Sequence, residues 1–431
     1  MLPLDAKPLY SLKATPAEVA TSWSKDEPII ALIGNGNSSK WSRWSVIAPA
    51  TGERLTLNGL DAIEKLRPHL EKNPSHSLLP NWIGYLGYEL GLVIEPTVAS
   101  LPKQDWPLVD LVWCDKALVH DSETNTWWSI GGIEPPEIIS QQPSNLACST
   151  LVDESGDESF ISAVKKTIGY IHEGDIFQAN ITRRFSSEVT GDIRSAALSL
   201  LGKQGGWFGA WIEFPDDGRF LLSMSPELFL QINGETKEVI TRPMKGTRPE
   251  HEEPGVLLDS EKDAAELHMI VDLMRNDLGR VCKFGSIKVR EARSLEKHPT
   301  VWQCVGEVHG VLRETISICD VIEATFPAGS ITGAPKIRAM QIIDELENSP
   351  RGPYCGAIGI LGNSSMLNVG IRTALFTGST NVADFRGFMT YSTGCGIVAE
   401  STPLAELAES EVKTHILNTF LGTVPKYTPR N

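Results

Sequence analysis

One lysine in a rigid stretch of backbone is the first candidate for chemistry in this chain. Lys245 lies in the run Thr-Arg-Pro-Met-Lys-Gly-Thr-Arg-Pro, residues 241–249. The proline fixes φ before the lysine, and the glycine after it permits close approach of a ligand or another segment. Such an amine becomes a nucleophile when burial and nearby cations lower its pKa, and Arg242 and Arg248 are close in sequence. The alternative is a lysine in a solvated turn, because short motifs often match by chance.

Carboxylates at helical spacing form the second candidate site. The Thr-Pro pair at 402–403 is suited to begin a helix. Glu406, Glu409 and Lys413 would then share one face of that helix. Carboxylates arranged in this way can hold Mg²⁺ and leave positions for water and a substrate oxygen, and Glu266 on another expected helix can complete the set. The alternative is a solvated helix face with an ion pair between Glu409 and Lys413.

Two segments rich in small residues offer backbone N–H groups to an anion. Gly394, Cys395 and Gly396 are expected to form a turn whose N–H groups bind a carboxylate. Residues 326–336 form a longer loop that opens a helix, and such a loop either binds an anion or lets two backbones pack closely. The histidines lack the spacing of a zinc site, and the sequence shows no phosphate-binding loop.

The composition restricts the class of protein. The chain has 431 residues, of which 41% are hydrophobic and 22% charged. It contains no apolar run of the roughly 18 residues needed to span a membrane. A net charge of −15 argues against nucleic-acid binding, whereas basic residues gathered in glycine-rich and proline-rich segments suit a small anionic substrate. No secretion signal and no C-x-x-C pair are visible, so we expect a cytoplasmic protein with reduced thiols.

The hydrophobic pattern predicts the elements that must carry these residues. Alternating apolar runs across 207–247 indicate strands, with Asn233 and Gly234 as a hairpin signal and Lys245 just after a strand. Helical spacing predicts three helices, at 158–173, at 260–278 and at 334–346. A stretch rich in proline, glutamine and serine between 134 and 149 indicates a boundary near residue 150.

Several longer segments together resemble the chorismate-utilising enzymes. These segments are residues 263–280, 326–347, 351–356, 369–373 and 394–399. Residues 84–88, Gly-Tyr-Leu-Gly-Tyr, resemble the amino-terminal part of the anthranilate and aminodeoxychorismate synthases. The resemblance implies one large α+β fold with two packed, mostly antiparallel β-sheets flanked by helices. In that fold, residues 1–150 form an amino-terminal lobe and residues 151–431 the chorismate-binding catalytic domain.

Two positions indicate the branch of the family. Isochorismate and salicylate synthases carry a lysine that activates water where this chain has Gln178. Anthranilate synthases have alanine at the place of Lys245, whereas lysine there is typical of aminodeoxychorismate synthase component I. The resemblance therefore implies conversion of chorismate to 4-amino-4-deoxychorismate, a step towards p-aminobenzoate and folate. Anthranilate synthase component I is the alternative within the family.

The resemblance also implies roles for individual residues. Lys245 would attack C2 of chorismate as the C4 hydroxyl leaves, and Glu227 would protonate that hydroxyl. Glu266 and Glu409 would hold Mg²⁺, with Glu406 nearby. The residues implied in substrate binding are Gly394, Cys395, Gly396 and Lys413 for the ring carboxylate, Tyr354 and Arg372 for the enolpyruvyl carboxylate, and Ser330.

This chain departs from the family pattern at one position, and it lacks a segment like a glutaminase. The family often has a histidine where this chain has Gln303, and an amide can hydrogen-bond to substrate but cannot exchange protons near neutral pH. A catalytically silent chorismate-binding or regulatory subunit is therefore the rival of another class. No segment resembles a glutaminase, so we expect ammonia to come from a separate glutamine amidotransferase subunit.

Overall fold

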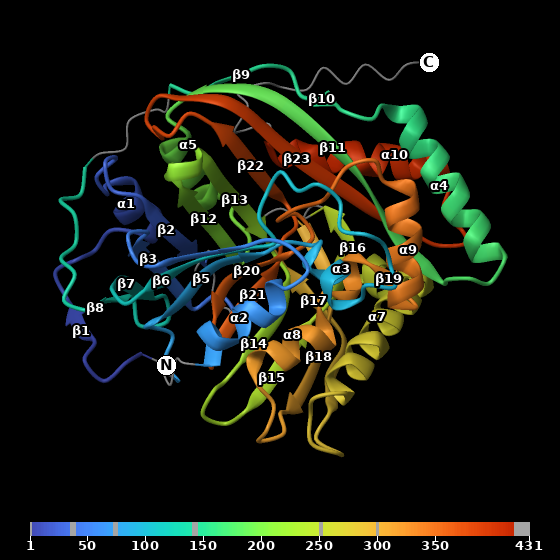
Figure 1. The fold of residues 1–431 in the computed structure, drawn as a ribbon, viewed down its shortest axis with the longest axis horizontal. Coiled ribbons are helices and arrows are strands. Elements are labelled where there is room, and N and C mark those ends of the chain that lie inside the picture. Colours follow the sequence, from blue (N-terminus) through green and yellow to red (C-terminus); the bar gives the residue numbers. More distant parts are fainter. Residues whose placement is uncertain are drawn as a thin grey trace.

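The chain folds around two β-sheets that are flanked by helices (Figure 1). This computed structural model describes residues 2–34, 40–71, 76–139, 145–249, 253–298 and 301–417. Within these residues the strands form one sheet of 13 and one of 10 strands, and neighbouring strands pair antiparallel. The predicted α+β class with two mostly antiparallel sheets is confirmed.

The first sheet runs through strands from both ends of the chain. In spatial order it contains β1 (Lys7–Leu9), β8 (Thr126–Ile130), β7 (Ala117–Asp121), β3 (Trp44–Pro49), β2 (Ile29–Ile33), β12 (Phe208–Phe214), β13 (Arg219–Ser225), β22 (Thr373–Gly378), β23 (Phe385–Ile397), β11 (Gln178–Gly191) and β10 (Val152–Asp153). Two short strands, β9 (Ala147–Cys148) and β19 (Gly333–Ala334), also pair with β11.

The second sheet is assembled in the same mixed way. In spatial order it contains β16 (Met244–Pro249), β18 (Val301–Val311), β15 (Glu238–Arg242), β14 (Leu228–Ile232), β21 (Ser365–Val369), β20 (Ala357–Leu361), β5 (Asn81–Leu86), β6 (Val109–Cys114) and β4 (Arg54–Leu57). β17 (Lys288–Lys297) pairs with β18. Because β2 pairs with β12 and β5 with β20, strands from either side of residue 150 are neighbours in both sheets.

The helices cover the outer faces of the sheets. They are α1 (Pro16–Thr21), α2 (Ala62–Glu71), α3 (Leu90–Ile94), α4 (Asp157–His172), α5 (Ile193–Gln204), α6 (Pro254–Asp259), α7 (Glu261–Gly279), α8 (Ile318–Thr325), α9 (Lys336–Leu346) and α10 (Pro403–Val412). Figure 1 shows α4, α7, α9 and α10 along one side of the molecule and α1 and α5 along the other. None of the helices in the described residues is long and apolar enough to cross a membrane.

Helix α7 shows how local sequence places a site residue. The Ser260 side chain accepts a hydrogen bond from the Asp263 N–H at 3.2 Å and thereby caps the first turn. Leu267 and Ile270 on its apolar stripe are fully buried in the main core against β18. Each such side chain stabilises the fold by about 1.5–3 kcal/mol, and this burial fixes the rotation of the helix. Glu266 is consequently only partly buried, at the edge of the stripe.

Lys245 lies inside a strand, which corrects the prediction that it follows one. Pro243 has no N–H and interrupts the ladder between β15 and β16, but both strands continue along β18. Lys245 pairs with Cys304, and a β-bulge separates it from Thr247. Gly246 occupies the bulge with φ +76°, a conformation that favours glycine. The bulge therefore shifts the pairing of β16 with β18 directly after the lysine.

The predicted turn at Gly394–Gly396 is wrong, because these residues lie in strand β23 and pair with β11. The glycine at 396 allows close approach instead of chain reversal. A Cβ atom there would stand 2.6 Å from Gln178 Nε2 and 3.1 Å from Lys245 Nζ. The predicted start of α10 is confirmed with Pro403 in its first turn, although the Thr402 side chain makes no capping hydrogen bond.

Candidate active site

The Lys245 ammonium lies between the two sheets, against β23 and the loop that precedes α9. Its Nζ donates a hydrogen bond to the Ser330 carbonyl oxygen at 3.3 Å and lies beside Gly396. Burial lowers the pKa of Lys245 below its ordinary value of 10.5, against the opposing charges of Glu266 and Glu227. A larger fraction of unprotonated amine is therefore present near neutral pH than on a surface lysine.

The cation that helps to lower the pKa of Lys245 differs from the sequence-based expectation. Lys413 contributes to the lowering, after burial, whereas Arg242 and Arg248 are engaged elsewhere. Arg242 forms ion pairs with Glu296 and with Glu307, the second at 3.2 Å. Arg248 pairs with Asp263 at 3.4 Å. Closeness in sequence did not bring these arginines to the lysine, because their partners come from distant segments.

Glu227 is a buried acid on the connection between β13 and β14. Glu227 is only 3% exposed. Burial raises the pKa of Glu227 from its ordinary value of 4.5 to about 7, against the opposing effects of the Ser330 side chain and the Lys245 charge. Its backbone is fixed, since the Val369 N–H donates to the Glu227 carbonyl oxygen at 3.0 Å. A carboxyl group with this pKa can release a proton near neutral pH.

The carboxylates of α10 lie together as their spacing predicts. Lys413 Nζ is 2.8 Å from Glu409 Oε1 and donates to the Gly394 carbonyl oxygen at 2.7 Å. The Glu406 carboxylate accepts a hydrogen bond from Ser401 Oγ at 2.7 Å. Ligand atoms of Glu406, Glu409 and Cys395 all lie within 4.8 Å of one another. Although burial opposes it, Cys395 and Glu409 raise the pKa of Lys413, so this amine stays charged.

The donor chemistry of these carboxylates suits the magnesium ion expected from the sequence. Glu266 on α7 and Glu409 on α10 both act on the Lys245 charge, so two helices present carboxylates towards the same amine. Their oxygen atoms are the hard ligands that Mg²⁺ prefers, and a site built from few carboxylates leaves places for water and substrate. Burial raises the pKa of the Cys395 thiol, which makes it a poor ligand beside them.

Buried polar atoms without partners mark the space beside Lys245. Gln178 is fully buried, and neither of its amide atoms meets a hydrogen-bond partner in the described part of the chain. The same holds for Gln303 Oε1. Gln303 Nε2 donates to Thr247 Oγ1 at 3.3 Å, two residues along the strand from Lys245. Since buried polar atoms are nearly always satisfied, these amide atoms beside Lys245 are available to a polar ligand.

Arg372 and Tyr354 are a cation and a phenol that both lie within the electrostatic influence of Tyr391. Among the residues that the structure describes, the Arg372 guanidinium has no carboxylate partner, and burial lowers its pKa. Tyr354 is 4% exposed, and burial raises its pKa. The electrostatic influence of Tyr391 reaches both side chains, and the Tyr391 hydroxyl donates to the Lys413 carbonyl oxygen at 3.3 Å. A desolvated arginine without an anion suits the carboxylate of a ligand.

The structure thus gathers most of the predicted residues around Lys245. This lysine lies within reach of Glu227, Ser330 and Gly396, and the charges of Glu266, Glu409 and Lys413 act on it. Tyr391 was missed by sequence reasoning. In β23 it occupies an ordinary core position of the strand alternation, so only its spatial proximity to Arg372 and Tyr354 reveals it.

Comparison with known proteins agrees with this geometry. Residues 22–419 match the family model described as "chorismate binding enzyme". Aminodeoxychorismate synthase component 1 of Escherichia coli strain K12 is 34% identical over 412 residues, which cover 89% of this chain and 86% of that protein. Anthranilate synthase component 1 3 of Haloarcula marismortui is 36% identical over 290 residues, 65% of this chain, and the match spans only 55% of that relative's length.

A solved structure shows the same fold at low sequence identity. The menaquinone-specific isochorismate synthase of Escherichia coli superimposes with a TM-score of 0.76 and 15% identity, covering 96% of this chain and 94% of that chain. At this identity the likeness is one of fold alone. The family match over most of the chain, together with the relative that is 34% identical along nearly its whole length, is the evidence for kinship. The chain belongs to the chorismate binding enzyme family.

Proposed function

We propose that this protein aminates chorismate at C4 to give 4-amino-4-deoxychorismate. The observation that carries the proposal is the pairing of Lys245, whose pKa burial lowers, with Glu227, whose pKa burial raises to about 7. One group can act as a nucleophile and the other as an acid at the same pH. The relative named aminodeoxychorismate synthase component 1 supports this choice.

The proposed reaction has two displacement steps that balance. In the first, the neutral Lys245 amine forms a bond to C2, the ring double bond shifts, and the C4–O bond breaks as Glu227 gives its proton to the departing hydroxyl. Water leaves, and the new ammonium at C2 returns a proton to Glu227. In the second, ammonia forms a bond to C4, the double bond shifts back, and the C2–N bond breaks as Glu227 gives its proton to the departing Lys245 amine. The new ammonium at C4 then returns a proton to Glu227.

The two carboxylates of chorismate have separate partners in this proposal. Arg372 and Tyr354 bind the enolpyruvyl carboxylate, for which the arginine fork is suited. Lys413 and the 394–396 backbone bind the ring carboxylate, and the amides of Gln178 and Gln303 gain partners from the ligand. Glu266 and Glu409, with Glu406 nearby, would hold Mg²⁺, which when bound there neutralises negative charge on the ring carboxylate.

A glutamine amidotransferase subunit is proposed as the source of ammonia. The relatives that match along the chain carry the designation component 1, which supports the existence of a second component. The chain supplies the synthase chemistry, and the partner supplies ammonia from glutamine. Glutamine-dependent turnover by this chain alone would contradict the proposal.

The proposed activity is tested by incubating the pure chain with chorismate, Mg²⁺ and an ammonium salt and separating the products. We expect 4-amino-4-deoxychorismate. Formation of anthranilate would instead assign the chain to the anthranilate synthase branch, to which the Haloarcula marismortui relative belongs by name. Tight chorismate binding without turnover at any ammonia concentration would favour a silent subunit, the role that Gln303 leaves open.

Removing one proposed metal ligand is expected to weaken Mg²⁺ binding without unfolding the protein. In Glu409→Gln the side chain keeps its shape but loses its charge, so we expect Mg²⁺ affinity in the presence of chorismate to fall about tenfold or more. Calorimetric titration with Mg²⁺ measures this. The control is Glu400→Gln, at an exposed glutamate just before α10. Equal Mg²⁺ affinity in both variants would remove Glu409 from the site.

A further inference from the structure

A buried carboxylate from the amino-terminal part of the chain holds a loop of the candidate site. Glu89 is 3% exposed and directly precedes α3. Its two carboxylate oxygens accept hydrogen bonds from the Arg351 N–H at 2.6 Å and from the Gly352 N–H at 3.0 Å. The Tyr88 N–H donates in turn to the Gly352 carbonyl oxygen at 2.8 Å. Two neighbouring residues thus fix the backbone that leads to Tyr354.

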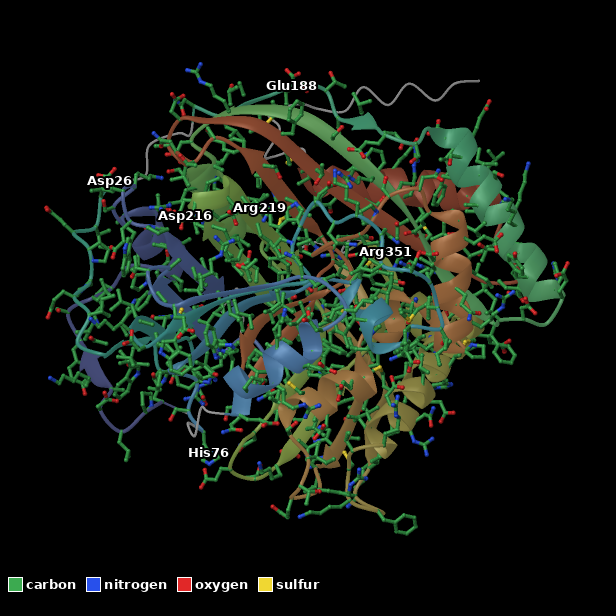
Figure 2. The ribbon with its side chains drawn as sticks, viewed as in Figure 1. Asp26, His76, Glu188, Asp216, Arg219 and Arg351 are labelled. Carbon is green, nitrogen blue, oxygen red and sulfur yellow. The ribbon has the colours of Figure 1, made fainter. Side chains whose placement is uncertain are left out.

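The side chain of the same arginine extends the connection into the site. The Arg351 guanidinium donates to the Ile331 carbonyl oxygen at 2.9 Å and to the Asn180 carbonyl oxygen at 2.6 Å. It also forms a two-point ion pair with Glu347, at 2.8 and 2.7 Å, and lies 4.5 Å from the centre of the Tyr88 ring. Figure 2 shows Arg351 in the interior, whereas Asp26, His76 and Glu188 lie at the periphery.

These contacts join the segments that carry three site residues. Ile331 follows Ser330, whose carbonyl oxygen accepts the hydrogen bond of Lys245. Asn180 lies two residues from Gln178 on β11. Tyr354 lies three residues beyond Arg351 on the loop that Glu89 holds. A displacement of Arg351 would therefore move the acceptor of Lys245, the buried amide and the phenol together.

The chemistry of this connection is costly for the fold, which points to a role beyond packing. Burial raises the pKa of Glu89 from its ordinary value of 4.5 to about 7, although the N–H groups of Arg351 and Gly352 oppose the shift. Buried ion pairs are often no more stabilising than apolar side chains of similar volume, but they define one geometry. The Glu89 carboxylate accepts two adjacent N–H groups, and the Arg351 guanidinium makes four hydrogen bonds. Directional bonds of this kind fix positions that apolar contacts leave adjustable.

We propose that Glu89 and Arg351 are positioning residues that set the placement of Tyr354, Ser330 and Gln178, and through them the affinity for the enolpyruvyl carboxylate. The identity of that ligand rests on the proposed function, while the connection itself does not. Neither residue has to touch the substrate. Their loss should therefore weaken substrate binding more than it slows the chemistry of bound substrate.

The test compares two buried glutamates that differ in what they hold. Glu89→Gln keeps the shape but places an amide NH₂ where a carboxylate oxygen accepted a backbone N–H. Its control is Glu213→Gln, because Glu213 is also buried and also accepts a backbone N–H, that of Ile29 at 3.2 Å, although it pairs in addition with the Arg194 guanidinium at 2.5 Å. Glu213 lies in β12 and is held by Arg194 of α5 and by Trp211, none of which belongs to the proposed site.

The expected result is a split between stability and binding. Both variants should lower Tm, but only Glu89→Gln should raise the dissociation constant for chorismate, by about tenfold, the scale of one lost buried hydrogen bond. Its kcat at saturating chorismate should fall by no more than about threefold, because Glu89 does not touch the reacting atoms. Arg351→Lys is a second variant, which keeps the charge and the N–H that Glu89 accepts but loses the fork, and it should also weaken chorismate binding.

Three outcomes would be decisive. If wild type binds chorismate and both Glu89→Gln and Arg351→Lys bind it equally well, the positioning role is overturned while the proposed function stands. If Glu213→Gln weakens chorismate binding as much as Glu89→Gln, the effect is one of general stability and the positioning role is again overturned. If wild type itself does not bind chorismate, the proposed function fails first. Should Glu89→Gln not fold, Arg351→Lys carries the same comparison.

Discussion

Replacing Lys245 with alanine should lower the formation of 4-amino-4-deoxychorismate about a thousandfold or more, because the proposed route then lacks its nucleophile. Chorismate binding should remain, since the proposed partners of the two carboxylates are Arg372, Tyr354 and Lys413. The burial that lowers the pKa of Lys245 is what makes its amine reactive near neutral pH. A dissociation constant for chorismate and a product assay, measured on the same variant, separate these two effects.

A second variant distinguishes nucleophilic attack from charge stabilisation. Lys245→Arg retains a cation beside Glu227 and Glu266 but cannot form the adduct, because guanidinium stays protonated. It should be as inactive as Lys245→Ala. Intact-mass analysis of acid-quenched enzyme should show chorismate minus water attached to wild type and to neither variant. Full activity in Lys245→Ala, or partial activity in Lys245→Arg without an adduct, would exclude the covalent route and the branch assignment that depends on it.

Elements governed by local rules could be predicted from the sequence. The helix predicted from residue 260 to 278 is observed as α7, because its cap at Ser260 and its apolar stripe are encoded within 19 residues. The helices predicted at 158–173 and 334–346 are observed as α4 and α9, shifted by at most two residues at their ends. The ion pair between Glu409 and Lys413 follows from their spacing of four residues alone.

Strand positions around the site were harder, because glycine and proline have more than one use. Gly394 and Gly396 were predicted to form a turn, but the strand needs them where Asn180, Gln178 and Lys245 approach closely. Lys245 was predicted to follow a strand, yet after Pro243 the chain resumes its pairing on β18 and Lys245 lies within that pairing. Nothing in the local sequence shows which segment will lie against a glycine.

The site itself depends on partners that are distant in the chain. Glu227 entered the predicted site only through the resemblance to a family, since nothing in its local sequence distinguishes it from other glutamates. Arg242 and Arg248 have the spacing of pKa-lowering neighbours, but carboxylates from β17, β18 and α7 hold them. Glu89 accepts hydrogen bonds from Arg351 and Gly352, which lie 262 and 263 positions away in the chain.

Replacing Glu227 with glutamine should have opposite effects on activity and on stability. Activity should fall by about a hundredfold to ten-thousandfold, the range found when a general acid is lost. The amide keeps the shape of the carboxyl group but cannot protonate the departing hydroxyl. The product assay at saturating chorismate measures the loss, and Glu235→Gln, at an exposed glutamate beyond β14, is the control.

The effect on stability depends on pH, with a sign set by the raised pKa of Glu227. A carboxyl group with a pKa of about 7 when folded and 4.5 when exposed binds its proton more tightly in the folded state. The wild-type free energy of unfolding therefore falls as pH rises from 4.5 to about 7, because the folded state must give up a proton that it binds more tightly than the unfolded state does. Above about pH 7 the full cost of the buried charge is present. Glutamine is neutral throughout and avoids that cost.

We therefore expect Glu227→Gln to have nearly the wild-type free energy of unfolding at pH 4.5 and below, and to exceed it by about 1–2 kcal/mol at pH 8. This is less than the full shift implies, since Lys245 loses a neighbouring negative charge. Urea unfolding at the two pH values measures the difference. An equal gain at both would contradict the raised pKa, and unchanged activity would move the acid to another group. A variant that is more stable yet inactive would show that the fold tolerates a buried acid because the reaction needs one.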